Sequence, residues 1–299
     1  MTDTIGFIGL GVMGAGMAKN ILKAGFKLVA TTSSAEKADA FRALGAEIVD
    51  SAAAIAGRTT LIVTCVPDAA ALRQTLTGDN GLASASWEGG LLVDCSTIAP
   101  FEAEEMGAAL ADVGAGLVDA PVSGGRKGAE EGKLTIMCGG SDAEVARARP
   151  VLDAMGTNIH HVGPLGAGQA VKACNQLMVA VNMMGAFEAV ALARAAGVDP
   201  KVMREVLSSG AARSGVLEAH ALRYIEGNLE PGFRAELMRK DLGIAAAVGA
   251  HYKRAQPATG LAHQLLVAAC NSGFAKLDSA ALGLLYDQMN GTDDERPTR

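Results

Sequence analysis

The sequence predicts an α/β protein in which a doubly wound parallel sheet is followed by an all-helical C-terminal domain, with a long helix joining the two. Two observations support this fold class. In the first half of the chain, short apolar runs alternate with helical stretches, which is typical of a parallel sheet covered on both faces. After residue 166 the strand patterns stop, and a continuous helical run of about 30 residues begins. We therefore expect one domain over residues 1–165 and a second over residues 166–299.

The individual elements follow from local patterns. Helices are predicted over residues 15–24 and 35–44, and each ends at a glycine. In the second half, the long helix stops at Gly197, and the next one starts with Asp199 as its N-cap and Pro200 as its first residue. The predicted strands are residues 5–9, 27–30, 47–49, 61–66, 91–95, 116–119 and 134–137.

Composition excludes several classes of protein. With 49% hydrophobic and 19% charged residues, the chain is too apolar to be disordered, and only residues 293–299 are expected to form a polar tail. The 26 Lys and Arg against 32 Asp and Glu give a net charge of −6, which argues against a nucleic-acid partner. The five cysteines and five histidines show no ligand or disulfide spacing, so we expect no metal site.

Neither a membrane span nor a targeting segment is predicted. The most apolar long segment, residues 177–193, is interrupted by Asn182 and Glu188, which indicates a buried helix. The first residues contain no basic segment followed by a long apolar one. We therefore expect a cytoplasmic protein.

A glycine-rich turn follows the first predicted strand and opens the first helix. Its GxGxxG pattern has a mechanical explanation: one glycine makes the tight turn, the next lets the backbone approach a pyrophosphate, and the third lets helix and strand pack closely. The helix N-terminus then offers N–H groups to the anion. The motif predicts a Rossmann-like dinucleotide site whose candidate residues are Gly9, Leu10, Gly11, Val12, Met13 and Gly14.

The tip of the second predicted strand bears on the choice between NAD and NADP. An acidic residue there would bind the 2′-hydroxyl of NAD, whereas this chain has hydroxyl residues. They could bind a 2′-phosphate together with a lysine one turn later; alternatively, they only cap the next helix. We favour NADP over NAD, with Thr32, Ser33, Ser34 and Lys37 as the candidate residues.

Several further motifs occur together in a fixed order. The chain reads Asp-Ala-Pro-Val-Ser-Gly-Gly at residues 119–125, Gly-Ala-Gly-Gln-Ala-Val-Lys at 166–172 with Asn175, and Lys-Asp-Leu at 240–242. With the glycine turn, Cys-Val-Pro-Asp at 65–68 and Asp-Cys-Ser-Thr at 94–97, the chain closely resembles the β-hydroxyacid dehydrogenases from residue 5 to residue 287. That family includes 3-hydroxyisobutyrate dehydrogenase and tartronate semialdehyde (2-hydroxy-3-oxopropionate) reductase.

The resemblance implies a catalytic set on the long helix. Lys172, Asn175 and Gln176 share one helical face, which is otherwise apolar. Taken alone, Lys172 could be a lysine that reaches solvent near a helix start. In the family the matching lysine is the general acid/base and the matching amide orients the substrate oxygen, so Asn175 is predicted to do so here, with Gln176 as the second candidate amide. An Asn-Gln pair is more like the tartronate semialdehyde reductases, whereas 3-hydroxyisobutyrate dehydrogenases usually show Asn-Asn.

The substrate carboxylate is assigned to the Ser-Gly-Gly motif. A hydroxyl and two glycines allow successive N–H groups to converge on an anion, and the segment resembles the family's carboxylate site. The candidate residues are Ser123, Gly124 and Gly125. Arg126 and Lys127 follow directly and could accept a second anionic group, although we favour a solvated surface loop.

The resemblance also assigns cofactor contacts outside the glycine turn. Thr97 and Lys240 match positions on the nicotinamide side, and Val66, Pro67 and the following Asp68 match the loop beside the ribose. Taken alone, the first two would be part of a capping turn and of a solvated helix pair. Two further positions, Phe233 and Asp278, match recurrent family residues that we interpret as structural.

The predicted function is reversible hydride transfer between NAD(P) and a small 3-hydroxy acid or semialdehyde, most like 2-hydroxy-3-oxopropionate reductase. The alternatives are 3-hydroxyisobutyrate or another small-semialdehyde dehydrogenase, an imine reductase, a phosphosugar dehydrogenase, and a non-catalytic dinucleotide-sensing module. Imine reductases usually replace Lys172 with Asp or Tyr, and phosphosugar dehydrogenases carry a His that this chain lacks before Asn175. The Ala- and Gly-rich helical domain and the family resemblance predict a homodimer or homotetramer.

Overall fold

The computed structural model describes residues 3–292, so the predicted tail at 293–299 lies outside the described residues. The chain divides into two compact units between Lys172 and Ala173. That division falls inside the long helix, slightly after the boundary expected from the sequence at residue 165. The domain boundary itself stays a prediction.

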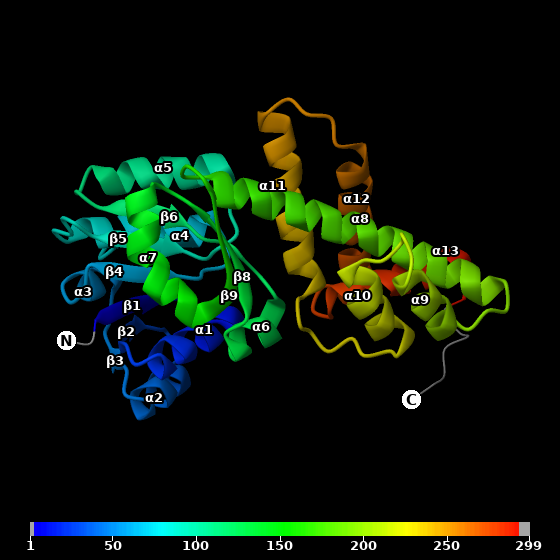
Figure 1. Ribbon diagram of the computed structural model, residues 1–299, viewed down its shortest axis with the longest axis horizontal. Helices are drawn as coiled ribbons and strands as arrows, with labels where there is room; N and C mark the ends of the chain where they lie inside the picture. Colours follow the sequence, from blue (N-terminus) through cyan, green and yellow to red (C-terminus); the bar gives the residue numbers. More distant parts are fainter. Residues whose placement is uncertain (1–2, 293–299) are drawn as a thin grey trace. The chain divides into compact units, whose positions relative to one another are not determined.

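The first unit is built on one nine-stranded sheet (Figure 1). Its strand order is β3-β2-β1-β4-β5-β6-β8-β7, with β9 paired to β8, and the first six strands in that order are parallel. The predicted doubly wound parallel sheet is therefore confirmed. The strands are β1 (Thr4–Ile8), β2 (Lys27–Thr31), β3 (Glu47–Ile48), β4 (Leu61–Thr64), β5 (Leu91–Asp94), β6 (Gly116–Asp119), β7 (Val122–Ser123), β8 (Leu134–Gly139) and β9 (Gly156–Gly163).

One end of the sheet differs from the expectation. Strand β8 runs antiparallel to β6 and β7 and parallel to β9. Neither β7 nor β9 was expected from the sequence. Strand β7 has only two residues, and β9 is a mostly exposed edge strand with the polar sequence Gly-Thr-Asn-Ile-His-His-Val-Gly. Without an apolar run, β9 lacked the pattern that identifies the other strands.

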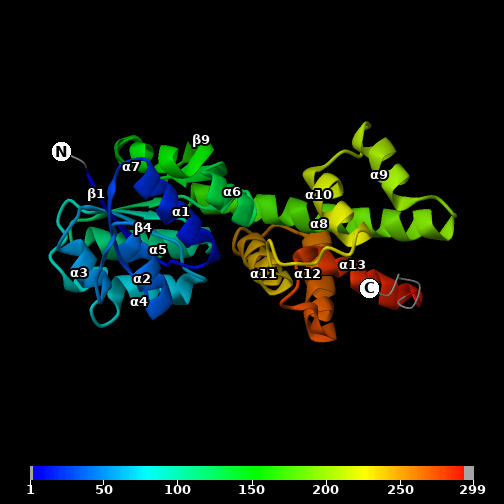
Figure 2. The same ribbon diagram turned by 90° about the horizontal axis from the view of Figure 1, so that it is seen from below.

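Both faces of the sheet are covered by helices, as Figure 2 shows. Alternate strand residues face opposite cores: Leu91 and Val93 belong to one cluster, and Leu92 belongs to the other. The first cluster includes residues of α1 (Val12–Lys23), α2 (Ala35–Ala43), α6 (Gly125–Glu131) and α7 (Asp142–Met155). The second includes residues of α3 (Ala52–Ala56), α4 (Ala69–Thr77), η1 (Leu82–Ser84) and α5 (Pro100–Ala111).

The second unit is helical. Helix α8 spans Ala167–Ala195, as predicted to within one residue, and it crosses the division between the units. As predicted, Asp199 caps the next helix, with its carboxylate accepting from the Lys201 N–H. The remaining elements are α9 (Pro200–Ser208), α10 (Gly215–Ile225), α11 (Ala235–His251), α12 (Pro257–Ala269), a π-helical turn η2 (Cys270–Phe274), η3 (Ser279–Ala281) and α13 (Leu282–Asn290).

Phe187 of α8 lies in the core of the second unit. Its ring packs edge-on against the ring of Tyr224, with the two centroids 5.2 Å apart. Asp278 lies 3% exposed and accepts the N–H groups of Gly232 and Phe233 at 2.9 and 3.1 Å. Its carboxylate also pairs with Arg223 at 3.4 Å. Asp278 thus ties the segment that precedes α11 to the start of η3.

Helix α8 is also long and apolar enough, by length and composition alone, to cross a membrane. Its most apolar window has a mean hydropathy of 1.5, and 44% of that window is buried within the protein. A core helix of a soluble protein has the same character. The interpretation of this segment as a buried helix stays a prediction.

Candidate active site

The glycine turn between β1 and α1 has a closed side and an open side. Gly9 has a φ of +102°, and a Cβ there would collide with the carbonyl oxygen of Cys65. A Cβ at Gly14 would collide with the carbonyl oxygen of Gly9, so strand and helix pack at backbone contact. At Gly11, by contrast, a Cβ would meet nothing within 4 Å, and no side chain caps the helix. The first N–H groups of α1 therefore fit a phosphate.

The other residues of the turn point in different directions. Val12 is 63% exposed at the helix start, whereas Leu10 is buried in the core below the turn. Met13 is partly buried against the same core. Any contact that Leu10 makes with a cofactor would therefore come from its backbone.

The loops after β4 and β5 lie against this turn. Val66 Cγ1 is 3.3 Å from the position of a Cβ on Gly9, and the Val66 N–H donates to Ser96 Oγ at 2.9 Å. Pro67 is exposed next to Val66, and Asp68 caps α4 by accepting from the Ala71 N–H. Because β1, β4 and β5 are parallel, all three loops meet at one edge of the sheet, where ligands bind in folds of this type.

At the tip of β2 the hydroxyl groups are partly committed to the backbone. Ser34 Oγ accepts the Lys37 N–H at 3.3 Å as the N-cap of α2, and Thr32 Oγ1 accepts the Ser34 N–H at 3.2 Å. Helix capping, the alternative raised by the sequence, thus applies to Ser34. The Ser33 side chain and the Lys37 side chain are exposed.

The Ser-Gly-Gly motif forms the turn from β7 into α6. Gly124 and Gly125 have φ values of +131° and +60°, a backbone that favours glycine, and a Cβ on Gly125 would meet nothing within 4 Å. Ser123 is half-buried at the end of β7. Asn20 of α1 donates to the carbonyl oxygen of Ala129 at 2.7 Å and so ties α6 to the helix of the glycine turn.

The two cations after this motif pair with their own helix. Arg126 Nε donates to Glu130 at 2.8 Å, and Lys127 Nζ lies 3.9 Å from Glu131. Their side chains are 59% and 86% exposed. This geometry supports the solvated surface segment favoured from the sequence.

The start of α8 is held by two buried residues, which lie in the motifs at 119–125 and 166–172 but for which the sequence predicted no role. Both carboxylate oxygens of Asp119, at the end of β6, accept backbone N–H groups, from Gly166 at 2.8 Å and from Gln169 at 2.7 Å. The Gln169 side chain accepts the Ile98 N–H at 3.2 Å and donates to the Ser96 carbonyl oxygen at 2.9 Å. The sequence signal for both Asp119 and Gln169 was a polar residue inside a stretch rich in Gly, Ala and Val.

Burial dominates the electrostatics of Asp119. Desolvation raises the pKa of its carboxyl group to about 6, although the Gly166 and Gln169 N–H donors lower it and Asp94 raises it further. Asp119 has no exposed surface. The Asp119 carboxyl group, which accepts the N–H groups at the start of α8, therefore loses its proton as the pH rises through about 6.

Lys172 follows Gln169 by three residues, so it lies about one turn further along α8. Its side chain is 6% exposed, and it is the only Lys or Arg among the buried side chains of residues 3–292. Lysine side chains are almost never buried this completely unless they are paired. The burial of Lys172 argues against the alternative of a lysine that reaches solvent near a helix start.

In the second unit the two candidate amides have different surroundings. Gln176 is 4% exposed; its Nε2 donates to Asp241 Oδ2 at 2.7 Å, and its Oε1 accepts from Asn175 Nδ2 at 2.7 Å. Lys240 Nζ pairs with the other oxygen of Asp241 at 3.0 Å. Asn175 is half-buried. Gln176 is therefore committed to this network, which leaves Asn175 as the amide at its end.

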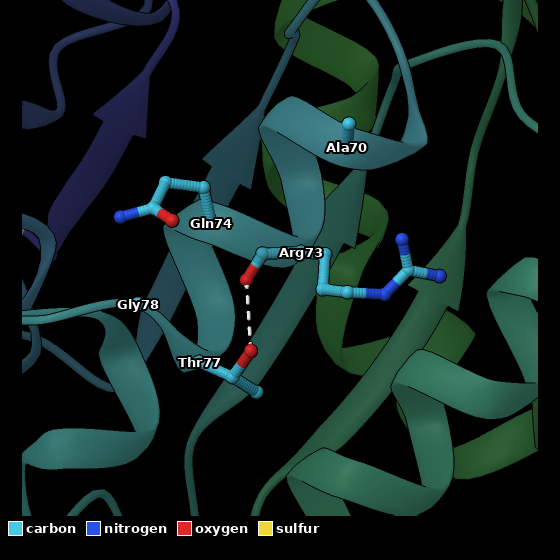
Figure 3. Close-up of a pocket in the computed structure, with 5 residues that line it drawn as sticks. All are labelled: Ala70, Arg73, Gln74, Thr77 and Gly78. Carbon is cyan, nitrogen blue, oxygen red and sulfur yellow. Dashed lines mark hydrogen bonds between the residues drawn. The ribbon is translucent and has the colours of Figure 1, made fainter.

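Two cavities lie away from the predicted residues. A hollow of about 260 Å³ on α4 is lined by Arg73, Gln74 and Thr77, whose hydroxyl donates to the Arg73 carbonyl oxygen at 3.1 Å (Figure 3). A larger one of about 1080 Å³ lies along α8 and α13 in the second unit. Within residues 3–292, no group of three or more His, Cys, Asp or Glu residues could hold a metal ion.

Two family models together cover almost the whole chain. Residues 4–163 match the NAD binding domain of 6-phosphogluconate dehydrogenase. Residues 166–286 match the NAD-binding domain of NADP-dependent 3-hydroxyisobutyrate dehydrogenase. The chain belongs to the β-hydroxyacid dehydrogenase family.

Relatives of this β-hydroxyacid dehydrogenase align over nearly their full length. The 2-hydroxy-3-oxopropionate reductase of Escherichia coli K12 is 38% identical over 278 residues, which are 93% of this chain and 95% of the relative. The 2-(hydroxymethyl)glutarate dehydrogenase of Eubacterium barkeri is 37% identical over 288 residues, 96% of each chain. The structure of Mycobacterium tuberculosis 3-hydroxyisobutyrate dehydrogenase with L-serine is 32% identical, with a TM-score of 0.88 and coverage of 96% and 99%.

The family and the geometry agree on the class of enzyme. This β-hydroxyacid dehydrogenase is an oxidoreductase that uses a nicotinamide cofactor. The open backbone at Gly11 and the uncapped start of α1 fit the pyrophosphate of such a cofactor. The substrate and the choice between NAD and NADP are finer questions.

Proposed function

We propose that this enzyme catalyses reversible reduction of a small semialdehyde that bears a carboxylate, with 2-hydroxy-3-oxopropionate as the leading candidate substrate. The observation that carries the proposal is the buried Lys172, three residues before Asn175 on one helix. An imine reductase is disfavoured because a lysine stands at that position. A dinucleotide-sensing module would not need a buried lysine there.

Lys172 is proposed to handle the proton. When bound, the nicotinamide supplies or accepts a hydride at its C4. In the direction of reduction, Lys172 Nζ gives a proton to the carbonyl oxygen as the carbon gains the hydride, and the aldehyde becomes a primary alcohol. In oxidation the neutral amine takes the hydroxyl proton back. Asn175 would hold the same oxygen through its amide.

The substrate carboxylate is proposed to bind at Ser123, Gly124 and Gly125. The positive φ values of both glycines support this assignment, because such a backbone can turn successive N–H groups toward one anion. The open space at Gly125 would admit the carboxylate. Arg126 already has a carboxylate partner in Glu130, so we assign no second anionic group of the substrate to it.

We favour NADP over NAD as the cofactor. Ser33 and Lys37 are exposed at the tip of β2, and neither that tip nor the loop up to Ser34 contains an acidic residue. Thr32 and Ser34 would contribute through the hydroxyl protons that their backbone contacts do not use. A 2′-phosphate would thus meet a hydroxyl and a cation rather than a carboxylate.

We also propose self-association in the cytoplasm. Helix α9 has no buried residue, and apolar side chains of α8 and α9 are exposed, with Leu192 at 71% and Val206 at 62%. A homodimer or homotetramer would cover them. Light scattering after size exclusion would measure the mass.

A substrate panel tests the proposed reaction. Initial rates of NADPH and NADH oxidation would be measured with tartronate, methylmalonate, succinic and sulfolactic semialdehydes and with glyoxylate. We expect turnover of 2-hydroxy-3-oxopropionate with NADPH, and none with Lys172→Ala. Turnover of another semialdehyde would reassign the substrate, whereas turnover that does not depend on Lys172 would overturn the mechanism.

A further inference from the structure

We propose that Gln169 is a positioning residue that couples the loop carrying Thr97 to the start of the helix carrying Lys172. The inference rests on the proposed function of Lys172 and on the position beside the nicotinamide that the family resemblance implies for Thr97. It concerns neither a substrate contact nor a cofactor contact, because Gln169 has no exposed surface.

The Gln169 carboxamide bridges the two backbone groups that flank Thr97. Its oxygen accepts the N–H of Ile98 at 3.2 Å, and its Nε2 donates to the carbonyl oxygen of Ser96 at 2.9 Å. Thr97 is the half-exposed residue in a stretch, residues 91–100, whose other members are buried. The bridge therefore holds the backbone on both sides of the one residue of that stretch that is not buried.

The backbone of Gln169 is fixed as firmly as its side chain. Its N–H donates to Asp119 Oδ2 at 2.7 Å, while Asp119 Oδ1 accepts the Gly166 N–H at 2.8 Å. Gly168 seats this first turn of α8 on the sheet, since a Cβ there would lie 2.7 Å from Asp119 Oδ2 and 3.0 Å from the Asp119 carbonyl oxygen. The loop after β5, the end of β6 and the start of α8 thus form one hydrogen-bonded body.

This body sets the spacing between two groups that act on the same reaction. Thr97 matches a position beside the nicotinamide, and Lys172 lies one helical turn after Gln169. A shift of about 1 Å between hydride donor and proton donor is enough to slow a reaction by about 10²-fold. Only an amide meets both backbone groups at every pH: an ionised glutamate loses the donor, and a leucine loses donor and acceptor.

The decisive variant is Gln169→Glu, because it keeps the size of the side chain and the acceptor for the Ile98 N–H. The ionised carboxylate would face the Ser96 carbonyl oxygen, whereas the protonated form can donate to it. We expect kcat to fall about tenfold at about pH 9 and to recover towards that of the unmodified enzyme at about pH 6. The dissociation constant for NADPH should change less than about twofold, since the glycine turn is untouched. Gln74→Glu, at an exposed site on α4, is the matched control and should follow the unmodified enzyme at every pH.

A double-mutant cycle separates coupling from simple destabilisation. If Gln169 acts through Thr97, the kcat losses of Gln169→Leu and Thr97→Ala should be less than additive in the double variant. Full additivity, or a Gln169→Glu variant with normal kcat across the pH range, would overturn the inference. If Gln169→Leu fails to fold, the pH recovery of Gln169→Glu decides alone. The proposed function fails separately, when Lys172→Ala retains turnover.

Discussion

Helix α8 contributes to two networks of buried polar groups, one in each compact unit. The first network binds backbone groups, and the second binds side chains. In the first unit, Asp119 and Gln169 bind backbone groups of the helix start and of the loop after β5. In the second unit, Asp241 and Gln176 bind side chains and end at the Asn175 amide. Lys172 and Asn175 lie three residues apart on the helix, and Gln169 and Gln176, the residues beside them in these networks, bind different kinds of group.

The two networks should therefore respond differently when one of their contacts is removed. Backbone contacts fix where an element lies, so their loss should shift a whole loop and lower stability. Side-chain contacts fix how one group is oriented, so their loss should change catalysis as well as the stability of the unit in which they are buried. The sole tryptophan, Trp87, is buried in the first unit and gives a fluorescence signal for that unit alone.

The largest effect is expected at Lys172, which lies on α8 between Gln169 and Asn175. Lys172→Ala should lower kcat by about 10²–10⁴-fold, because the developing alkoxide then lacks its proton donor. Affinity for NADPH, measured by fluorescence titration, should stay near that of the unmodified enzyme. Lys127→Ala, at an 86% exposed side chain, should leave kcat unchanged. An active Lys172→Ala enzyme would remove Lys172 from the mechanism.

Asp119 should make the stability of the first unit depend on pH. Its pKa is raised from 3.8 to about 6, so the folded form binds a proton that the unfolded chain releases near pH 4. This contribution is fully present below about pH 4 and is lost as pH rises through about 6. The shift of roughly two units corresponds to about 3 kcal/mol.

Urea unfolding followed by Trp87 fluorescence checks this expectation. Between about pH 4 and pH 7, the free energy of unfolding should fall more steeply in the unmodified protein than in Asp119→Asn, which cannot titrate. Asp119→Asn should also be less stable overall, because one backbone N–H loses its acceptor. Equal pH slopes in the two proteins would show that Asp119 does not titrate in this range.

In the second unit, Gln176→Leu should remove the contact that orients Asn175. Asp241 loses one donor and Asn175 loses its acceptor, so kcat/KM should fall about 5–100-fold, corresponding to about 1–3 kcal/mol. Because the buried Asp241 loses a donor, the second unit should also be destabilised by about 1–3 kcal/mol. Thermal unfolding followed by circular dichroism measures this loss, since Trp87 reports on the first unit alone. Gln288→Leu, on the exposed side of α13, is the matched control. A normal kcat/KM in Gln176→Leu would mean that Asn175 needs no orienting partner.

The smallest effect is expected at the tip of β2. Ser33→Asp should lower the preference for NADPH over NADH by about fivefold, because a carboxylate repels the 2′-phosphate by about 1 kcal/mol. Ser33→Asn, which is similar in size and uncharged, should not do so. Rates and dissociation constants with both cofactors give the ratio. An unchanged ratio in Ser33→Asp would place the adenosine ribose elsewhere.

Local patterns in the sequence predicted most of the fold. Apolar runs identified β1 to β6 and β8, since buried parallel strands need apolar residues on both faces. The glycine turn, the length of α8 and the Asp199 cap were equally local, because each depends on residues within a few positions of one another. The same holds for the motifs that identify the family.

The features that the sequence did not predict depend on contacts between residues that are far apart in the chain. The reversal of β8 depends on its pairing with β6 and β7, not on its composition. Gln169 meets its partners 71 and 73 positions away, and Gln176 meets Asp241 65 positions away. The identity of a polar residue in a motif does not show whether its side chain contacts substrate, solvent or a buried carbonyl group. Only the fold supplies the partner, because desolvation forces each buried polar group to find one.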